Sequence, residues 1–169
     1  RARWTLLAQQ TLMMSYRRTA SGRPGDGRDD LYNTDIWDGF PATRERILRR
    51  IADANTPNPL ILSGDIHSFV AGDHFAPGDP KRCIASEFVG GSISSNNHAA
   101  YPDRPTETNP GFRFSNITSR GYARVDLTRD RCNVTFRGVA DVADPRSSAR
   151  DRAAFVVEAG RPGLEGGTS

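Results

Sequence analysis

An aspartate and a histidine two residues apart are the side chains in this sequence best suited to chemistry. Asp65 and His67 stand in Gly-Asp-Ile-His, directly after the apolar run at residues 59–62. A carboxylate and an imidazole held on one rigid loop form half of a site for a transition-metal ion. If the chain stays extended here, both side chains project to one face, roughly 6.5–7 Å apart at the backbone. The alternative interpretation is structural: an aspartate caps a turn beside a half-buried histidine.

The apolar run that precedes this pair is predicted to be a buried strand. Its branched side chains lie between Pro59 and Gly64, which is typical of a short strand rather than a helix. Open α/β folds bind their ligands just beyond the carboxyl ends of such strands. Gly64 lacks a Cβ where the backbone must turn or approach another group closely. The sequence therefore predicts that the pair lies at the tip of a strand.

The surrounding pattern predicts a mixed α/β architecture with one clear helix. Pro41 fits a first helical position, and apolar residues recur at helical spacing until the chain meets Pro57. Long polar stretches at residues 15–35 and 92–119 are predicted to be loops that either cover a site or are surface excursions. Gly-rich residues after 160 are predicted to be a tail. The predicted strands are residues 4–8, 59–63, 68–75, 83–89, 121–127, 133–139 and 153–158.

Length and composition fit one globular domain. The chain has 169 residues, 36% hydrophobic and 25% charged, with a net charge of +3. Neither a membrane span nor a signal peptide is visible. The chain begins at Arg1 in the middle of an apolar pattern, so we expect that an N-terminal part is absent. Cys83 and Cys132 form either one disulfide or two ordinary buried thiols. Nucleotide-binding glycine loops and the nucleophile elbow of α/β-hydrolases are missing.

Several motifs, taken in order, resemble the C-terminal third of the alkaline phosphatase D (PhoD-like) family of metallophosphatases. Each motif alone is weak, but their order and spacing match over almost the whole chain. The stretches are Trp-Thr-Leu-Leu-Ala-Gln-Gln (4–10), Trp-Asp-Gly-Phe-Pro with the basic helix after it (37–48), Leu-Ile-Leu-Ser-Gly-Asp-Ile-His-Ser (60–68), Glu-Phe-Val-Gly-Gly-Ser-Ile-Ser-Ser (87–95), Asn-Pro (109–110), Arg-Gly-Tyr (120–122) and Ala-Phe-Val-Val-Glu-Ala-Gly-Arg-Pro-Gly (154–163).

The resemblance implies a fold, an activity and a metal site. The fold would be the C-terminal part of a calcineurin-like metallophosphatase domain, a β-sandwich flanked by helices, covering residues 1–169. The activity would be hydrolysis of phosphate monoesters and diesters with a binuclear or multinuclear metal site, Fe³⁺ together with Ca²⁺. Asp65 and His67 would be metal ligands. Family members are typically exported from bacteria, which implies a secreted or periplasmic location.

Other residues lie in family motifs without an assigned role. They are candidates for supporting the metal ligands or binding substrate: Trp37, Asp38, Glu87, Asn109 and Arg120. Glu87 either orients His67 as an acceptor or pairs with an arginine, and a structural role is favoured.

Two departures from the family pattern limit the expected activity. Gly111 follows Asn109-Pro110, where the family commonly has a histidine. The family's earlier metal motifs have no counterpart, and we expect His74 and His98 to be surface residues. This chain alone is therefore expected to be inactive, with the missing N-terminal part as its partner and a small phosphoester as substrate.

Two other functions stay open from the sequence. One is a non-enzymatic α/β binding domain in which Gly-Asp-Ile-His is structural. The other is a basic nucleic-acid-binding module that uses the arginines of residues 44–50. In the phosphatase interpretation, nucleic acid enters only as a diester substrate.

Overall fold

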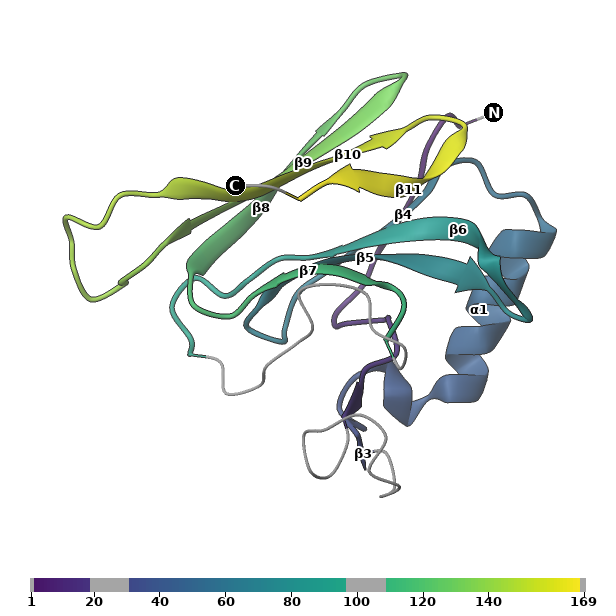
Figure 1. Ribbon diagram of the computed structural model, residues 1–169, viewed down its shortest axis with the longest axis horizontal. Coiled ribbons are helices and arrows are strands. Elements are labelled where there is room, and N and C mark those ends of the chain that lie inside the picture. The colour runs from purple at the N-terminus through teal and green to yellow at the C-terminus, as the bar shows by residue number, and fades with distance from the viewer. Residues whose placement is uncertain (1, 19–30, 97–108, 168–169) are drawn as a thin grey trace.

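The fold is taken from a computed structural model that describes residues 2–18, 31–96 and 109–167 (Figure 1). The helices are a 3₁₀ helix η1 (Trp37–Gly39) and α1 (Pro41–Asp53). The strands are β1 (Thr5–Ala8), β2 (Arg17–Arg18), β3 (Leu31–Tyr32), β4 (Pro59–Ser63), β5 (Phe69–Ala76), β6 (Asp79–Val89), β7 (Phe112–Asn116), β8 (Arg120–Leu127), β9 (Arg131–Val139), β10 (Arg150–Glu158) and β11 (Arg161–Gly166).

These strands form two larger sheets and one small pair. The five-stranded sheet has the order β1-β4-β6-β5-β7, and the four-stranded sheet has the order β11-β10-β9-β8. β4 pairs in parallel with both β1 and β6. β5 runs antiparallel to β6 and β7. The carboxyl ends of β1, β4 and β6 therefore lie at one edge of the sheet, where β5 begins.

The two larger sheets lie against each other, as Figure 1 shows, with an apolar core between them. Leu60 and Phe88 from the first sheet join Phe136 and Phe155 from the second in one buried cluster. The ring centroids lie 5.9 Å apart for Phe88 and Phe155 and 5.6 Å apart for Phe136 and Phe155. Aromatic pairs at such separations contribute about 0.5–1.5 kcal/mol each beyond their buried area. This core holds the strand ends in place.

Helix α1 covers the other face of the five-stranded sheet. Ile47 packs against Ile61 of β4, and Leu48 and Ile51 pack against Ile84 of β6. Because residues three or four apart share one helix face, these side chains form the apolar stripe that the sequence predicts. The predicted start of the helix at Pro41 is confirmed, and the helix ends at Asp53, before Pro57.

Three predicted irregular regions contain strands. The loop predicted over residues 15–35 contains the short antiparallel pair β2 and β3. β7 lies in the stretch predicted to be a loop over residues 92–119, and β11 lies in the predicted tail. The alternation of β7 is broken by a register irregularity opposite Ala71 and Gly72, so period-two analysis misses this strand. β11 follows a turn at Gly160, whose φ of 87° suits glycine. Strands dominate the fold over helices, so a plain α/β class is an incomplete description, and the calcineurin-like assignment stays a prediction.

Cys83 and Cys132 are free thiols, on β6 and β9 respectively. Burial raises the pKa of Cys83 to about 12, with a further rise from the negative charge of Asp73. Burial likewise raises the pKa of Cys132 to about 11. Both groups are therefore protonated thiols at neutral pH, with Cys132 buried and Cys83 partly buried. Within the described ranges, no helix has the length and apolar character needed to cross a membrane.

Candidate metal-binding loop

The loop that carries Asp65 and His67 connects β4 to β5 at the common edge of the parallel strands. It lies next to the loop that follows β6, because Gly90 N–H donates to Ser63 O at 2.8 Å. The start of β8 joins them, with Gly121 N–H donating to Ser92 O at 2.7 Å. Three chain segments distant in sequence thus meet where the sequence predicts a site.

The backbone of this loop is a tight turn, so the expectation of an extended chain is wrong. Asp65 has a φ of 69° and His67 a φ of 55°, both in the left-handed region. Ile66 N–H donates to Gly64 O at 2.8 Å, and the Ile66 side chain is buried in a cluster that includes Phe112. The buried isoleucine anchors the turn between the two polar residues. Non-glycine residues in this conformation store strain and cluster at functional sites.

The two polar side chains of the turn keep groups that can bind a ligand. Asp65 is exposed, and no hydrogen bond or ion pair from the described part of the chain engages its carboxylate. His67 Nδ1 lies 3.0 Å from the backbone oxygen of Asn96. Because a carbonyl only accepts, Nδ1 carries a hydrogen, and in the neutral ring Nε2 then keeps its lone pair. A carboxylate and an oriented imidazole of this kind suit a metal ion. The turn-capping interpretation of Asp65 has no supporting contact among the described residues.

Glu87 is buried beneath α1 and holds His74 rather than His67. Its Oε1 accepts from Met13 N–H at 2.7 Å and Ser63 Oγ–H at 3.1 Å, and its Oε2 accepts from Met14 N–H at 2.8 Å. His74 Nε2 lies 2.9 Å from the same Oε2. The idea that Glu87 orients His67 is therefore wrong, and its structural role is supported. His74 is only 5% exposed, so the expectation of a surface histidine is also wrong. His98 lies outside the described residues.

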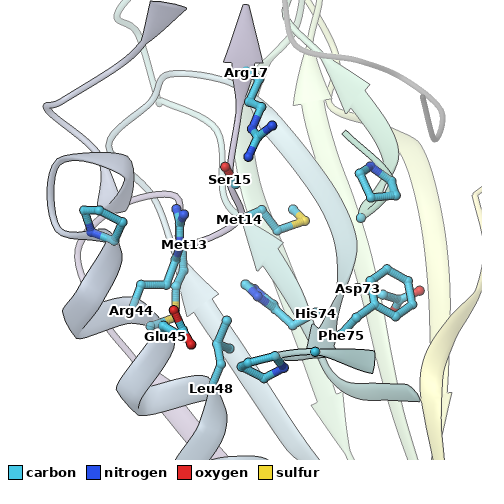
Figure 2. Close-up of a pocket in the computed structure, with 15 residues that line it drawn as sticks. Met13, Met14, Ser15, Arg17, Arg44, Glu45, Leu48, Asp73, His74 and Phe75 are labelled. Carbon is cyan, nitrogen blue, oxygen red and sulfur yellow. The ribbon is translucent and has the colours of Figure 1, made fainter. Parts of the chain in front are cut away.

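Sequence reasoning missed His74, although a signal was present. His74 follows Val70 and Gly72 at period two in β5, on the face that turns toward α1. His74 lines a cavity of about 620 Å³ between α1 and β5. Figure 2 shows it among the other residues around this cavity. Arg17, Arg44 and Leu48 also line this cavity, whereas Asp65 and His67 do not.

The Trp-Asp-Gly motif has structural partners. Trp37 Nε1–H donates to Gln9 Oε1 at 2.9 Å. Asp38 is buried, accepts from Tyr16 N–H at 2.8 Å and forms an ion pair with Arg44 at the start of α1. Both residues therefore fasten the segment before α1 to the chain around Gln9 and Tyr16.

The Asn109 side chain forms hydrogen bonds with both the backbone N–H and the backbone C=O of Arg17. Its Oδ1 accepts from Arg17 N–H at 2.8 Å, and its Nδ2–H donates to Arg17 O at 3.0 Å. This pattern imitates a strand partner for Arg17. Asn109 thus holds the chain near β2 in position.

Arg120 is buried at the edge that carries the candidate loop. Its Nη1 donates to Ile117 O at 3.0 Å and to Ser119 O at 2.8 Å. Its Nε has no acceptor, and no ion pair joins it to a described carboxylate. A guanidinium keeps its charge under all ordinary conditions. Arg120 thus differs from Asp38, whose carboxylate is paired with Arg44.

Across residues 2–18, 31–96 and 109–167, no group of three or more histidine, cysteine or acidic side chains is assembled for a metal ion. The loop brings Asp65 and His67 onto one turn, whereas Trp37, Asp38, Glu87 and Asn109 are engaged in structural contacts. Asp65 and His67 of this loop are suited to be two of the ligands of a metal ion.

The fold is dominated by β-sheets and carries a turn that can bind a ligand at the end of a central strand. Many protein families share these features, and comparison of this chain with known proteins identifies its family. The model of the PhoD-like phosphatase family matches residues 1–136. The chain belongs to this family. It is similar to alkaline phosphatase D of Bacillus subtilis (strain 168), with 31% identity over 96% of this chain and 28% of that protein. A solved structure titled "Structure of PhoD" matches 99% of this chain and 32% of its own chain, with 30% identity and a TM-score of 0.81. The chain thus spans about three tenths of the length of these relatives.

Proposed function

We propose that this chain contributes the Asp65–His67 turn to an enzyme that hydrolyses phosphate monoesters and diesters with bound metal ions. The observation that carries the proposal is the exposed, strained turn at the strand edge, where Asp65 is unengaged within the described part and His67 keeps Nε2 available. Family membership supports the substrate class, since the relatives are phosphatases by name. A secreted or periplasmic location belongs to the same proposal, by family resemblance alone.

In this proposal Asp65 offers a hard oxygen ligand and His67 an imidazole nitrogen. Metal ions in such sites supply Lewis acidity and neutralise charge during phosphoester cleavage, and Fe³⁺ with Ca²⁺ is our candidate pair. The backbone oxygen of Asn96 fixes the His67 ring at 3.0 Å, which orients Nε2 before a ligand arrives. Rigid placement matters because phosphoryl transfer depends on positioning and charge neutralisation.

Arg120 is our candidate for contact with the phosphate group. It stands at the same edge as the turn, through the Gly121–Ser92 hydrogen bond, and its charge has no carboxylate partner among the described residues. Arginine binds phosphate oxygens well because its planar fork offers several donors. The other motif residues are taken up by structural contacts and are not proposed to bind substrate.

The nucleic-acid-binding alternative is weakened by the helix itself. Arg44 is engaged by Asp38, and Arg49 forms an ion pair with Glu45. Arginines neutralised within the protein contribute less to phosphate binding than free ones. Nucleic acid remains only as a diester substrate in the main proposal.

The test is an activity measurement on the 169-residue chain and on a longer protein. Two ligands do not complete a binuclear site, so we expect the chain loaded with Fe³⁺ and Ca²⁺ to give no enzyme-like turnover of p-nitrophenyl phosphate. We expect activity when this chain replaces its matching part in alkaline phosphatase D of Bacillus subtilis. In that graft, Asp65→Asn should abolish activity, whereas the exposed control Asp126→Asn should not. A fully active Asp65→Asn graft would refute the proposal.

A further inference from the structure

The outer side of β1 is an open sheet edge with an apolar groove beside it. β1 is the last strand of its sheet and pairs in parallel with β4 alone. Thr5 N–H donates to Asn58 O at 3.4 Å, and Gln9 N–H donates to Leu62 O at 3.0 Å. Alternate residues of a parallel strand face the same neighbour. The N–H and C=O groups of Leu6 and Ala8 therefore point away from β4, where no described strand meets them.

The groove beside this edge has a volume of about 450 Å³ and lies between β1 and α1. Its walls are mostly apolar, with Leu6, Leu7, Ile47, Ile51 and Ile61, and Arg46 and Arg50 of α1 also line it. Leu6 is 46% exposed although it belongs to a strand. Burying such surface is favourable by roughly 25 cal/mol per Å². The unpaired backbone groups of β1 and the apolar side chains of the groove are thus both available to one partner.

Among the four outer strands of the two larger described sheets, β1 alone lacks the usual protection. Natural edges carry charges, prolines or bulges that prevent pairing with another strand. β7 has Arg113, β8 has Arg124, and β11 has Arg161. β1 is Thr-Leu-Leu-Ala, with neither a charge nor a proline. An edge of this kind is suited to receive another strand.

We propose that the β1 edge and the groove, defined by Leu6, Leu7, Ile47, Ile51 and Ile61, form a docking surface for one more β-strand. The strand pairs with the backbone of Leu6 and Ala8 and places apolar side chains in the groove. Its source is the polypeptide that the relatives have and that this chain does not match, because this chain covers only 28% and 32% of the two relatives. A second copy of this chain is the competing occupant.

Hydrogen exchange of single amides tests this proposal without using activity, so its outcome is separate from the phosphatase proposal. The isolated chain is compared with the graft into alkaline phosphatase D of Bacillus subtilis. The amides of Leu6 and Ala8 should exchange quickly in the isolated chain and at least about tenfold more slowly in the graft, because ladder hydrogen bonds protect them there. Leu7 faces β4 and should be protected in both proteins. Equal exchange of Leu6 in both proteins would overturn the proposal.

A substitution pair tests the groove by a second route. The chain and the unmatched part of the Bacillus protein are co-expressed as separate polypeptides and co-purified. Leu6→Lys should reduce co-purification about tenfold or more, because the charge is buried without a partner. Leu127→Lys alters another exposed leucine, on β8, and should have no effect. Equal recovery of both variants, or a dimer of the isolated chain that protects Leu6, would overturn the proposal.

Discussion

Two pairs of an acid and an imidazole lie in the described part of this chain, and their surroundings differ. Glu87 and His74 are buried, 2.9 Å apart, and Glu87 receives three further hydrogen bonds. Asp65 and His67 lie on a strained turn at the strand edge, with Asp65 exposed and not engaged by any described residue. A side chain whose hydrogen-bonding capacity is filled by protein has none left for a ligand. The comparison teaches that the fold uses the buried pair for stability and leaves Asp65 and His67 available.

The first prediction concerns the buried pair and has the largest expected effect. The Glu87 carboxylate accepts four hydrogen bonds. In Glu87→Gln one of its two oxygens becomes an NH₂ group, which donates, so the buried donors that faced this oxygen lose their acceptor. We expect the free energy of unfolding to fall by about 3–5 kcal/mol, as when a buried charge network loses a partner. Urea unfolding followed by circular dichroism measures the change.

The matched control is the exposed Glu165→Gln on β11, which should change stability by less than about 0.5 kcal/mol. If Glu87→Gln were equally mild, the buried network would not be structural, and the contrast between the two pairs would fail.

The second prediction extends the comparison to the segment before α1. Asp38→Asn leaves the Arg44 guanidinium without its carboxylate, although the amide oxygen can still accept from Tyr16 N–H. We expect a loss of about 1.5–3 kcal/mol, the range for hydrogen bonds to charged groups. Asp126→Asn, which breaks an exposed ion pair with Arg124, serves as the control in the same unfolding experiment. A loss as small as that of the control would show that the Trp-Asp-Gly motif does not fasten the chain.

The third prediction concerns the pH dependence of stability that the buried thiol of Cys132 causes. Burial raises the pKa of Cys132 to about 11. The unfolded thiol ionises near 9, so the native state holds this proton more tightly. Its stabilising contribution is complete below pH 9 and is lost as pH rises toward 11. At pH 10 the loss is about 1 kcal/mol. Stability measured from pH 8 to 11 should fall less in Cys132→Val, and parallel pH profiles would contradict the prediction.

The sequence predicts elements well where the pattern is regular. Helix α1, strand β4 and the β8–β9 hairpin follow from apolar periodicity and from Pro and Gly at their ends. β7 is missed because a register irregularity interrupts its alternation. β11 is missed because its residues are glycine-rich and charged, and it becomes a strand only by pairing with β10. Tertiary pairing of this kind leaves no local signal.

Candidate residues are predicted as a set, but their partners are not. Residue type and motif order select Asp65, His67 and Glu87 together, because all three lie in family motifs. Which imidazole Glu87 contacts depends on strand register, since Gly72 of β5 pairs with Glu87 and brings His74 alongside. The left-handed turn at Asp65 depends on the burial of Ile66, which the two-residue spacing does not reveal. Distances across strands therefore need the structure.

The last prediction concerns Asp65 and has the smallest effect on stability. A left-handed residue with a side chain costs roughly 1–2 kcal/mol relative to glycine, somewhat less for aspartate. Because no described group holds the Asp65 carboxylate, Asp65→Gly should keep or slightly raise the melting temperature while removing the proposed metal ligand. Asn58 offers a contrasting left-handed residue, with a φ of 42°, whose side chain donates to Arg3 O at 2.7 Å and accepts from Gly160 N–H at 2.6 Å. Asn58→Gly should therefore lower the melting temperature, since these two hydrogen bonds are lost. If Asp65→Gly were as destabilising as Asn58→Gly, Asp65 would be a structural cap. The proposal that Asp65 and His67 bind a ligand would then lose its support.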